Sequence, residues 1–341
     1  MGQQKPIKLL TTLLRHGTIP HALLFSGIDG IGKQLTAMAF AMACNCLNPE
    51  PEHLCEGGHS FHTAQNRHAE TNPCGNCRSC RKIQSGNHPD IIIIEPSGLF
   101  IRIRQIRALC RTLAMKPLEA RLRVVIILDS QAMNPAAGNA LLKVLEEPPD
   151  RTILILTARH PSDLFPTIVS RCQHIRFNPI TRKNIMTILI EKEGVHPDDA
   201  AIITTMASGS LSKALFMIGS QKRTNWIRQR KWLIDEIDSL TSRPIGSLLA
   251  FAARLSKNKE MLPESLEVIT SYFRDLVVCK YCPDKIINRD LQSKIQKASQ
   301  KMTTAALLSK ISSIQSAQRD IRINANLRLT LEVLVMRLAT V

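Results

Sequence analysis

Short apolar runs alternate with helix-periodic segments along the first half of the chain. The runs have the length and the continuous apolar character of strands buried on both faces, and they lie at 22–26, 91–94, 124–128 and 153–157. Helices are predicted between them at 34–46, 103–113 and 139–147. This alternation predicts an α/β fold up to residue 178, with a parallel sheet covered by helices on both faces.

The second half of the chain follows a different pattern, because no strand-like run comes after Phe177. Short helices are predicted next, with turns at Gly194 and Gly209. From residue 222 onward glycines are few and apolar residues recur at helix spacing. We therefore expect an α/β domain at 1–178, a small helical lid at 179–221 and a helical domain at 222–341.

The length and hydropathy of the chain limit its class. A chain of 341 residues is too long for one compact core, and its 44% hydrophobic content is that of an ordinary globular protein. No apolar run approaches the roughly 20 residues that span a bilayer, and the first residues lack the apolar segment of a secretory signal. We expect a cytoplasmic protein without a membrane partner.

The charge of the chain is strongly positive. Its 45 Lys and Arg against 28 Asp and Glu give a formal charge of +17 and a pI near 9.7, which favours a polyanionic partner. Aromatic residues make up 4%, so stacking on bases is poorly supplied and contact with DNA is expected through phosphates. One candidate is the basic segment 102–111, although a solvated helix face is the alternative reading.

A glycine-rich segment, G-I-D-G-I-G-K-Q at 27–34, lies directly between a predicted strand and a predicted helix. It nearly matches the phosphate-binding loop G-x-x-x-x-G-K-[ST], whose backbone N–H groups hold phosphates while its lysine reaches the terminal ones. The candidate nucleotide-binding residues here are Gly27, Gly30, Gly32, Lys33 and Gln34. Gln34 replaces the small hydroxyl residue that would hold Mg²⁺, so a tight turn without a ligand is the alternative.

Asp129 and Thr157 complete this degenerate nucleotide site. Asp129 follows an apolar strand, as does the aspartate that grips Mg²⁺ in nucleotide-hydrolysing proteins, and Thr157 ends the next strand. In such ATPases a glutamate usually follows the aspartate and orients the attacking water, but this chain has Ser130, which is no general base. ATP and Mg²⁺ therefore remain candidate ligands, whereas hydrolysis by this chain is not expected.

Three cysteines stand within seven residues, in C-G-N-C-R-S-C at 74–80. In a reducing compartment such a cluster predicts a metal site rather than disulfides, and the tight spacing lets Cys74, Cys77 and Cys80 reach one tetrahedral Zn²⁺. The spacing leaves the fourth ligand open between Cys46 and Cys55, because loop entropy differs little between them. Histidines at 59, 62 and 68 are further candidates.

Two longer motifs carry a family resemblance: N-A-L-L-K-V-L-E-E-P-P at 139–149 and T-I-V-S-R-C at 167–172. Together they resemble the AAA+ clamp loader of bacterial DNA polymerase III, in its delta-prime and gamma/tau subunits. The resemblance implies an AAA+ module with a helical lid and an all-α collar. It also implies an inserted zinc module at about 46–80, with Cys46 as the fourth ligand because C-L-N-P at 46–49 matches the family pattern. Such a zinc site is structural and closed.

The same resemblance assigns a role to Arg171. In that family the arginine of Ser-Arg-Cys reaches into the ATP site of a neighbouring subunit, where a guanidinium neutralises charge on the γ-phosphate. A surface arginine that pairs locally with Asp or Glu is the alternative. Motor subunits also carry a nucleotide-sensing arginine in the lid, where this chain has Ser212. The parts for hydrolysis are thus degraded while the part that serves a neighbour is kept, which resembles delta-prime rather than gamma/tau.

The resemblance implies a non-motor subunit, or stator, of the sliding-clamp loader. Its partners would be gamma/tau and delta subunits in a hetero-oligomeric ring that places the clamp on primed DNA, and no independent enzymatic activity is expected. Two other readings stay open from the residues. One is an ATP-hydrolysing motor subunit of the same ring, and the other is a zinc-containing DNA-binding module whose positive charge is its main functional property.

Overall fold

The computed structural model describes residues 2–48, 72–219, 223–259, 261–322 and 325–340. It divides into two compact units, Met1–Asn184 with Gly209–Ser212 and Ile185–Ser208 with Lys213–Val341, called here the α/β unit and the helical unit. No helix in the described part of the chain is long and apolar enough to cross a membrane. The expected three-part division at residues 178/179 and 221/222 stays a prediction.

A five-stranded parallel sheet forms the centre of the α/β unit, in the order β2-β3-β4-β1-β5. Its strands are β1 (Ala22–Ser26), β2 (Ile91–Ile94), β3 (Arg123–Ile127), β4 (Thr152–Ala158) and β5 (Gln173–Arg176). The predicted parallel sheet is confirmed, with four strands within one residue of their expected bounds. β5 was not predicted, because Ile175 is its one buried residue and a single apolar position gives no periodic pattern.

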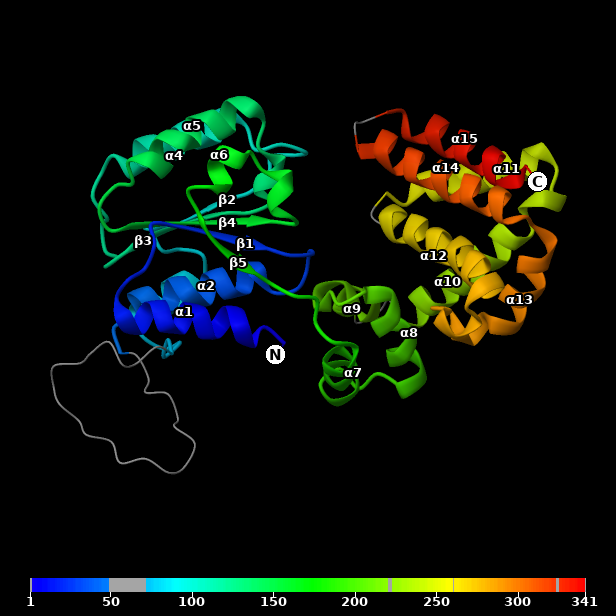
Figure 1. Cartoon of the computed structure of the whole chain (residues 1–341), viewed down its shortest axis with the longest axis horizontal. Helices are drawn as coiled ribbons and strands as arrows, with labels where there is room; N and C mark the ends of the chain where they lie inside the picture. The colour runs from blue at the N-terminus through cyan, green and yellow to red at the C-terminus, as the bar shows by residue number, and fades with distance from the viewer. Residues whose placement is uncertain (1, 49–71, 220–222, 260, 323–324, 341) are drawn as a thin grey trace. The chain divides into compact units, whose positions relative to one another are not determined.

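Helices cover both faces of this sheet (Figure 1). One face packs against α1 (Gln4–His16) and α2 (Lys33–Asn45). The other face packs against α4 (Ile103–Leu113), α5 (Pro135–Glu146) and α6 (Pro166–Val169). Successive strand residues point to opposite faces of the sheet, as Leu24 and Phe25 of β1 do. Because both faces are covered by helices, apolar residues are required at successive positions of the strand.

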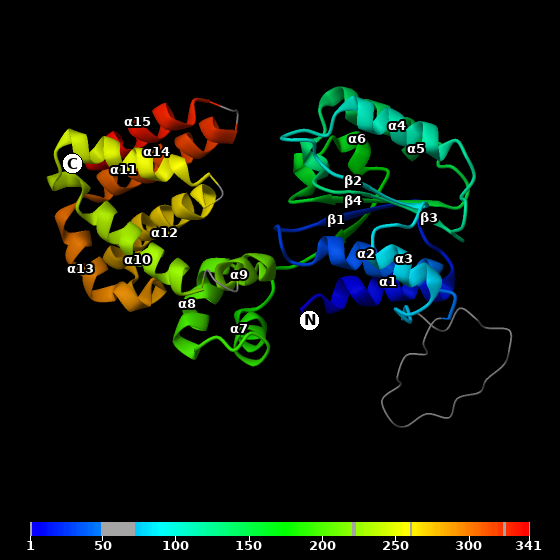
Figure 2. The same cartoon turned by 180° about the vertical axis from the view of Figure 1, so that it is seen from behind.

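Two helix boundaries have clear local causes. α5 begins at Pro135, four residues before the predicted start, because the side chain of Asn134 accepts a hydrogen bond from the N–H of Ala137 at 2.8 Å. α3 (Arg78–Gln84) begins in the same way, with the Cys77 side chain accepting from the N–H of Cys80. α3 lies beside the end of α2, as Figure 2 shows.

The helical unit contains no strand among its described residues, as the sequence predicts. α7 (Arg182–Glu191) leads from the sheet into it. The helices that follow are α8 (Pro197–Ala207), α9 (Leu211–Ile218), α10 (Arg223–Asp238), α11 (Ile245–Lys257), α12 (Leu262–Tyr281), α13 (Gln292–Lys301), α14 (Thr304–Arg322) and α15 (Leu327–Ala339). α15 packs on α11 and α14, and α12 packs on α10, α13 and α14.

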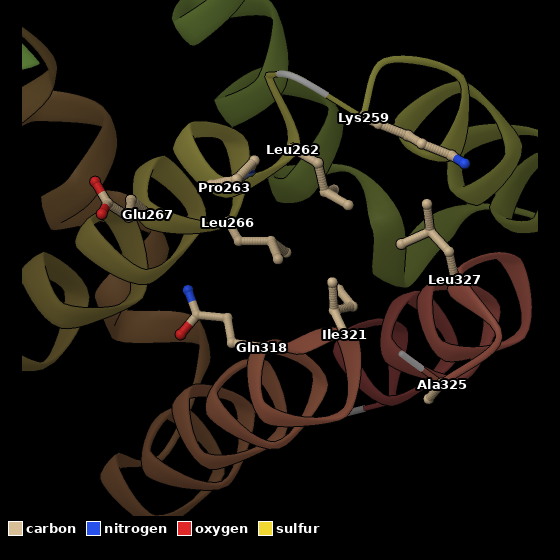
Figure 3. A pocket seen from close by; sticks show the side chains of 9 residues that line it. All are labelled: Lys259, Leu262, Pro263, Leu266, Glu267, Gln318, Ile321, Ala325 and Leu327. Carbon is tan, nitrogen blue, oxygen red and sulfur yellow. The ribbon is translucent and has the colours of Figure 1, made fainter. Parts of the chain in front are cut away.

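A mostly apolar pocket of about 500 Å³ lies within the helical unit (Figure 3). Leu262 and Leu266 line it from α12, Ile321 lines it from α14, and Leu327 lines it from the start of α15. Its other lining residues are Lys259, Pro263, Glu267, Gln318 and Ala325. Lys259 and Glu267 are the two charged residues of this lining.

Candidate nucleotide loop, exposed arginine and cysteine cluster

The glycine-rich loop follows β1 and takes a backbone path that requires glycine. Gly27, Gly30 and Gly32 have φ values of 147°, 74° and 98°, a region that side chains with a Cβ rarely adopt. A Cβ on Gly27 would lie 2.6 Å from both the Ile31 side chain and the Phe177 carbonyl oxygen. The glycine spacing recognised in the sequence is therefore set by backbone geometry, whether or not a phosphate binds.

Lys33 begins α2, and its ammonium is turned back onto the loop. It donates hydrogen bonds to the carbonyl oxygens of Gly27 and Ile28 and lies 3.7 Å from the carboxylate of Asp29. Burial lowers the pKa of Lys33, and the charges of Asp29 and Asp129 oppose this. Because loop oxygens already hold the ammonium, a phosphate would compete with them for it.

The remaining candidate residues gather at the same edge of the sheet. Asp129 follows β3, its N–H donates to the hydroxyl of Thr157 at 3.0 Å, and its carboxylate accepts from Gln131 at 3.2 Å. Lys33, Asp129 and Thr157 thus lie at the carboxyl ends of neighbouring strands, where ligands bind in open α/β sheets. The structure brings these three together, and Gln34 is exposed on the first turn of α2.

Ser130 and Ser212, the two serines that the sequence places in the degenerate nucleotide site, both have defined contacts. Ser130 is fully buried, and its hydroxyl donates to the carbonyl oxygen of Ile127 at 3.1 Å. The N–H of Ser212 donates to the carbonyl oxygen of Gly30 at 3.1 Å, so this segment packs directly on the glycine loop. Both serines therefore make structural contacts.

Arg171 lies between α6 and β5 at the surface of the α/β unit. Its guanidinium donates to the carboxylate of Glu146 at 2.7 Å and to the carbonyl oxygen of Thr167 at 2.9 Å. The Arg171 side chain is 35% exposed and that of Glu146 is 51% exposed. Exposed ion pairs contribute only about 0–1 kcal/mol, so this guanidinium can exchange its partner at little cost.

Four cysteine sulfurs converge where α2 ends and α3 begins. The Sγ atoms of Cys46, Cys74, Cys77 and Cys80 all lie within 4.8 Å of one another, and those of Cys46 and Cys74 are 3.5 Å apart. Four sulfurs around a tetrahedral Zn²⁺ at about 2.3 Å stand about 3.8 Å apart, so the cluster has the size and donor type of a metal site. Cys55 and the three histidines that compete as ligands lie outside the described residues.

Backbone N–H groups point at these sulfurs and favour their charged form. The N–H groups of Cys74, Cys77 and Cys80 lie 3.4, 3.3 and 3.4 Å from the Sγ atom of the preceding cysteine of the cluster. Burial raises the pKa of Cys46 and of Cys80. Burial also favours a raised pKa for Cys77. Hydrogen bonds from the N–H groups of Cys80 and Leu47 and from neighbouring thiols outweigh burial and lower the pKa of Cys77 to about 6.

The cluster is tied to the sheet by residues that the sequence analysis missed. The side chain of Asn45, buried directly before Cys46, donates to the carbonyl oxygen of Leu122 at 2.9 Å and accepts from its N–H at 3.1 Å. On α3, Lys82 pairs with Glu119 at 2.6 Å. The signal that could have indicated this contact is a buried polar side chain at the end of an apolar helix, because such a side chain needs a hydrogen-bond partner.

The basic segment at 102–111 and a second Cys-x-x-Cys at 279–282 also have defined positions. The side chains of Arg102, Arg104, Arg107 and Arg111 are exposed along α4, and none of them forms an ion pair with a described residue. Cys279 lies in the last turn of α12 and Cys282 just after its end. These two residues form the second Cys-x-x-Cys, which falls at a helix end.

Known proteins resemble the chain over nearly its whole length. The family described as DNA polymerase III, delta subunit, matches residues 2–69 and 59–181, and its C-terminal counterpart matches residues 224–340. DNA polymerase III subunit delta' of Bacillus subtilis is 29% identical over 98% of this chain and 96% of its own length. The delta' subunit of Pseudomonas aeruginosa is 36% identical over 45% of this chain and 41% of its own. DNA polymerase III subunit tau of Bacillus subtilis is 25% identical over 99% of this chain and 60% of its own.

Proposed function

The chain belongs to the DNA polymerase III delta-subunit family, and we propose that it is the delta-prime-type stator of a sliding-clamp loader. In this role it joins gamma/tau and delta subunits in a cytoplasmic hetero-oligomeric ring. It supplies Arg171 in trans to the ATP site of a neighbour, so that the ring can open the clamp and place it on primed DNA. DNA and the clamp are reached through the assembled ring.

The observation that carries this proposal is a contrast between two sets of side chains. Ser130 is buried and bonded within the fold, so no carboxylate is available at that position to orient an attacking water. Arg171 lies at the surface in an ion pair that can be broken at little cost in free energy. Its guanidinium can therefore leave Glu146 and contact the phosphate of a neighbouring subunit's ATP. The chain therefore keeps what a neighbour needs and has lost what its own hydrolysis needs.

A structural Zn²⁺ belongs to the same proposal. Its four ligands are Cys46, Cys74, Cys77 and Cys80, and a site filled by four protein sulfurs has no open position for chemistry. The metal would cross-link the end of α2 to the start of α3. The hydrogen bond of Asn45 to Leu122 and the ion pair of Lys82 with Glu119 would connect the metal site to the loop before β3.

The glycine loop is assigned a weaker role. Its N–H groups at the start of α2 and Lys33 provide a phosphate site, with Asp129 and Thr157 beside it, so ATP can bind there. Gln34 is a poor ligand for Mg²⁺, which requires near-ideal octahedral geometry. Binding without turnover is what these residues support.

Replacing Lys33 separates this role from that of a motor subunit. We expect a ring assembled with Lys33→Ala to hydrolyse ATP at the rate of the unmodified ring, because the chain's own site contributes no turnover. The matched control replaces the phosphate-loop lysine of the motor subunit in the same ring, which should lower the rate strongly. A comparable fall caused by Lys33→Ala would identify this chain as a motor and overturn the stator assignment.

A further inference from the structure

A second pocket of the helical unit is lined by two arginines, whereas the pocket in Figure 3 is lined by one lysine and one glutamate. It is an open pocket of about 420 Å³ at the surface of α10, α11 and α12, with Ser265 as its lining residue from α12. Arg228, Gln229 and Trp232 line it from α10, Arg254 lines it from α11, and Asn258 lines it from the turn after α11. Its volume falls in the range of small-molecule sites, and most of these side chains are polar or charged.

The charge of this pocket is uncompensated. Arg228 and Arg254 are both exposed, and neither forms an ion pair with a described residue. No carboxylate belongs to the lining of the pocket. The nearby Glu236 is already engaged, because it accepts from the indole N–H of Trp232 and pairs with Arg243. Two guanidinium groups that line one pocket without a carboxylate favour the binding of an anion there.

Trp232 holds one of these arginines in a fixed place. The guanidinium carbon of Arg254 lies 4.3 Å from the centroid of the Trp232 ring. The ring is itself fixed by its hydrogen bond to Glu236 at 3.1 Å and by Phe251, whose centroid is 6.0 Å away. A guanidinium stacked on an aromatic ring is a surface on which nucleobases stack, and it keeps its N–H donors for phosphate.

We propose that this pocket binds a nucleoside phosphate. Arg228 and Arg254 hold the phosphate, the base stacks on the Arg254–Trp232 pair, and the amides of Gln229 and Asn258 bond to the edge of the base. The site lies in the helical unit, so it is distinct from the phosphate loop and from Arg171. The same chemistry is offered by a free nucleotide and by a nucleotide of a single strand of DNA.

Tryptophan fluorescence of the full chain tests the site. Trp226 is 4% exposed and Trp232 is half-buried at the pocket, so a ligand there should quench Trp232 and leave Trp226 largely unchanged. One arm titrates dTMP, and another titrates a twelve-residue oligo(dT), both on a Lys33→Ala background that removes the phosphate-loop lysine. Quenching by dTMP identifies a free nucleotide as ligand, and quenching by oligo(dT) alone identifies a strand. Trp232→Phe should abolish the signal in either case.

Arginine variants connect the signal to the pocket. Arg228→Gln and Arg254→Gln should each weaken binding about tenfold, since each removes a charge-assisted hydrogen bond. Arg254→Lys keeps the charge but loses the planar stack, so it should bind between the wild type and Arg254→Gln. Arg319→Gln, an exposed arginine of α14, is the matched control and should bind as the wild type. Equal binding by all variants, or quenching by neither ligand, would overturn the proposal.

Discussion

Asp90 shows how a single buried charge organises the α/β unit. Its carboxylate is fully buried and accepts hydrogen bonds from the N–H groups of Leu118, Glu119 and Ala120 at 2.7–2.9 Å, and it pairs with Arg123 at 3.3 Å. Burial raises its pKa, but these donors together outweigh burial and hold the pKa below its ordinary value of 3.8. The residue thereby fixes the loop that precedes β3.

We predict that Asp90→Asn destabilises the α/β unit by about 3–5 kcal/mol at neutral pH, because it leaves Arg123 buried without a counter-charge. Since the folded-state pKa is depressed, this stabilisation is complete above pH 3.8 and is lost as the pH falls through the folded-state pKa. The difference between variant and wild type should therefore shrink in acid. Hydrogen exchange of the β2 and β3 amides reports on this unit, because both tryptophans lie in the helical unit.

Asp150→Asn is the control for that measurement, since Asp150 is exposed and should leave exchange unchanged. Protection of the β2 and β3 amides in Asp90→Asn equal to the wild type at neutral pH would show that the network does not stabilise the sheet.

Single residues differ in how far the sequence predicts them. Gly27 and Gly30 were recognised from the sequence, because backbone positions with positive φ strongly favour glycine. The contact of Asn45 with Leu122 joins residues 77 positions apart, so only the fold brings them together. Arg171 was recognised by its motif, whereas its partner Glu146 comes from the end of another helix and was not.

At the scale of elements, the cysteine cluster depends on two helix ends. Cys46 caps the end of α2, and Cys77 and Cys80 lie at the start of α3, so their spacing in sequence follows from where these helices stop and begin. A metal bound there would cross-link the end of α2 to the start of α3, two helices that already pack against each other. Removing one ligand should therefore affect metal content first and local order second.

We predict one Zn²⁺ per chain, lost on Cys46→Ser or Cys74→Ser and retained on Cys55→Ser and Cys279→Ser. The physical reason is that a closed site needs all four of its sulfurs, and Cys46 is the fourth sulfur placed within 4.8 Å of the others. Metal content of purified variants, measured by elemental analysis, checks this prediction. Metal loss on Cys55→Ser with retention on Cys46→Ser would assign the fourth position to Cys55 instead.

Strands with a mainly apolar sequence were the ones that the sequence predicted well. β1, β3 and β4 are buried throughout and β2 is half-buried, and each contains a run of at least four apolar residues that marks its position. β5 was missed because its exposed positions carry Gln173, His174 and Arg176, and a single buried isoleucine gives no period. α1 was missed although its first turn contains Pro6, which suits a helix start.

At the scale of the whole molecule, two units combine different kinds of binding surface. The α/β unit carries the glycine loop, the exposed Arg171 and the cysteine cluster. The helical unit carries an apolar pocket and the arginine-lined pocket. The charge of +17 predicts contact with polyanions. It does not predict where on the surface the contact lies, because that depends on which arginines have no ion-pair partner in the folded chain.

The central claim is that chemistry occurs next to this chain rather than in it. The direct measurement is ATP hydrolysis in a single turnover of a reconstituted ring that contains Arg171→Ala. Arg182→Ala, an exposed arginine at the start of α7, and Glu146→Gln, which frees Arg171 from its local partner, are the matched controls and should hydrolyse as the wild type. An arginine supplied in trans accelerates hydrolysis by about 10³–10⁵, so the account predicts that an assembled Arg171→Ala ring loses one ATP equivalent from its first turnover. A first turnover of unchanged size and rate in that ring would contradict the account.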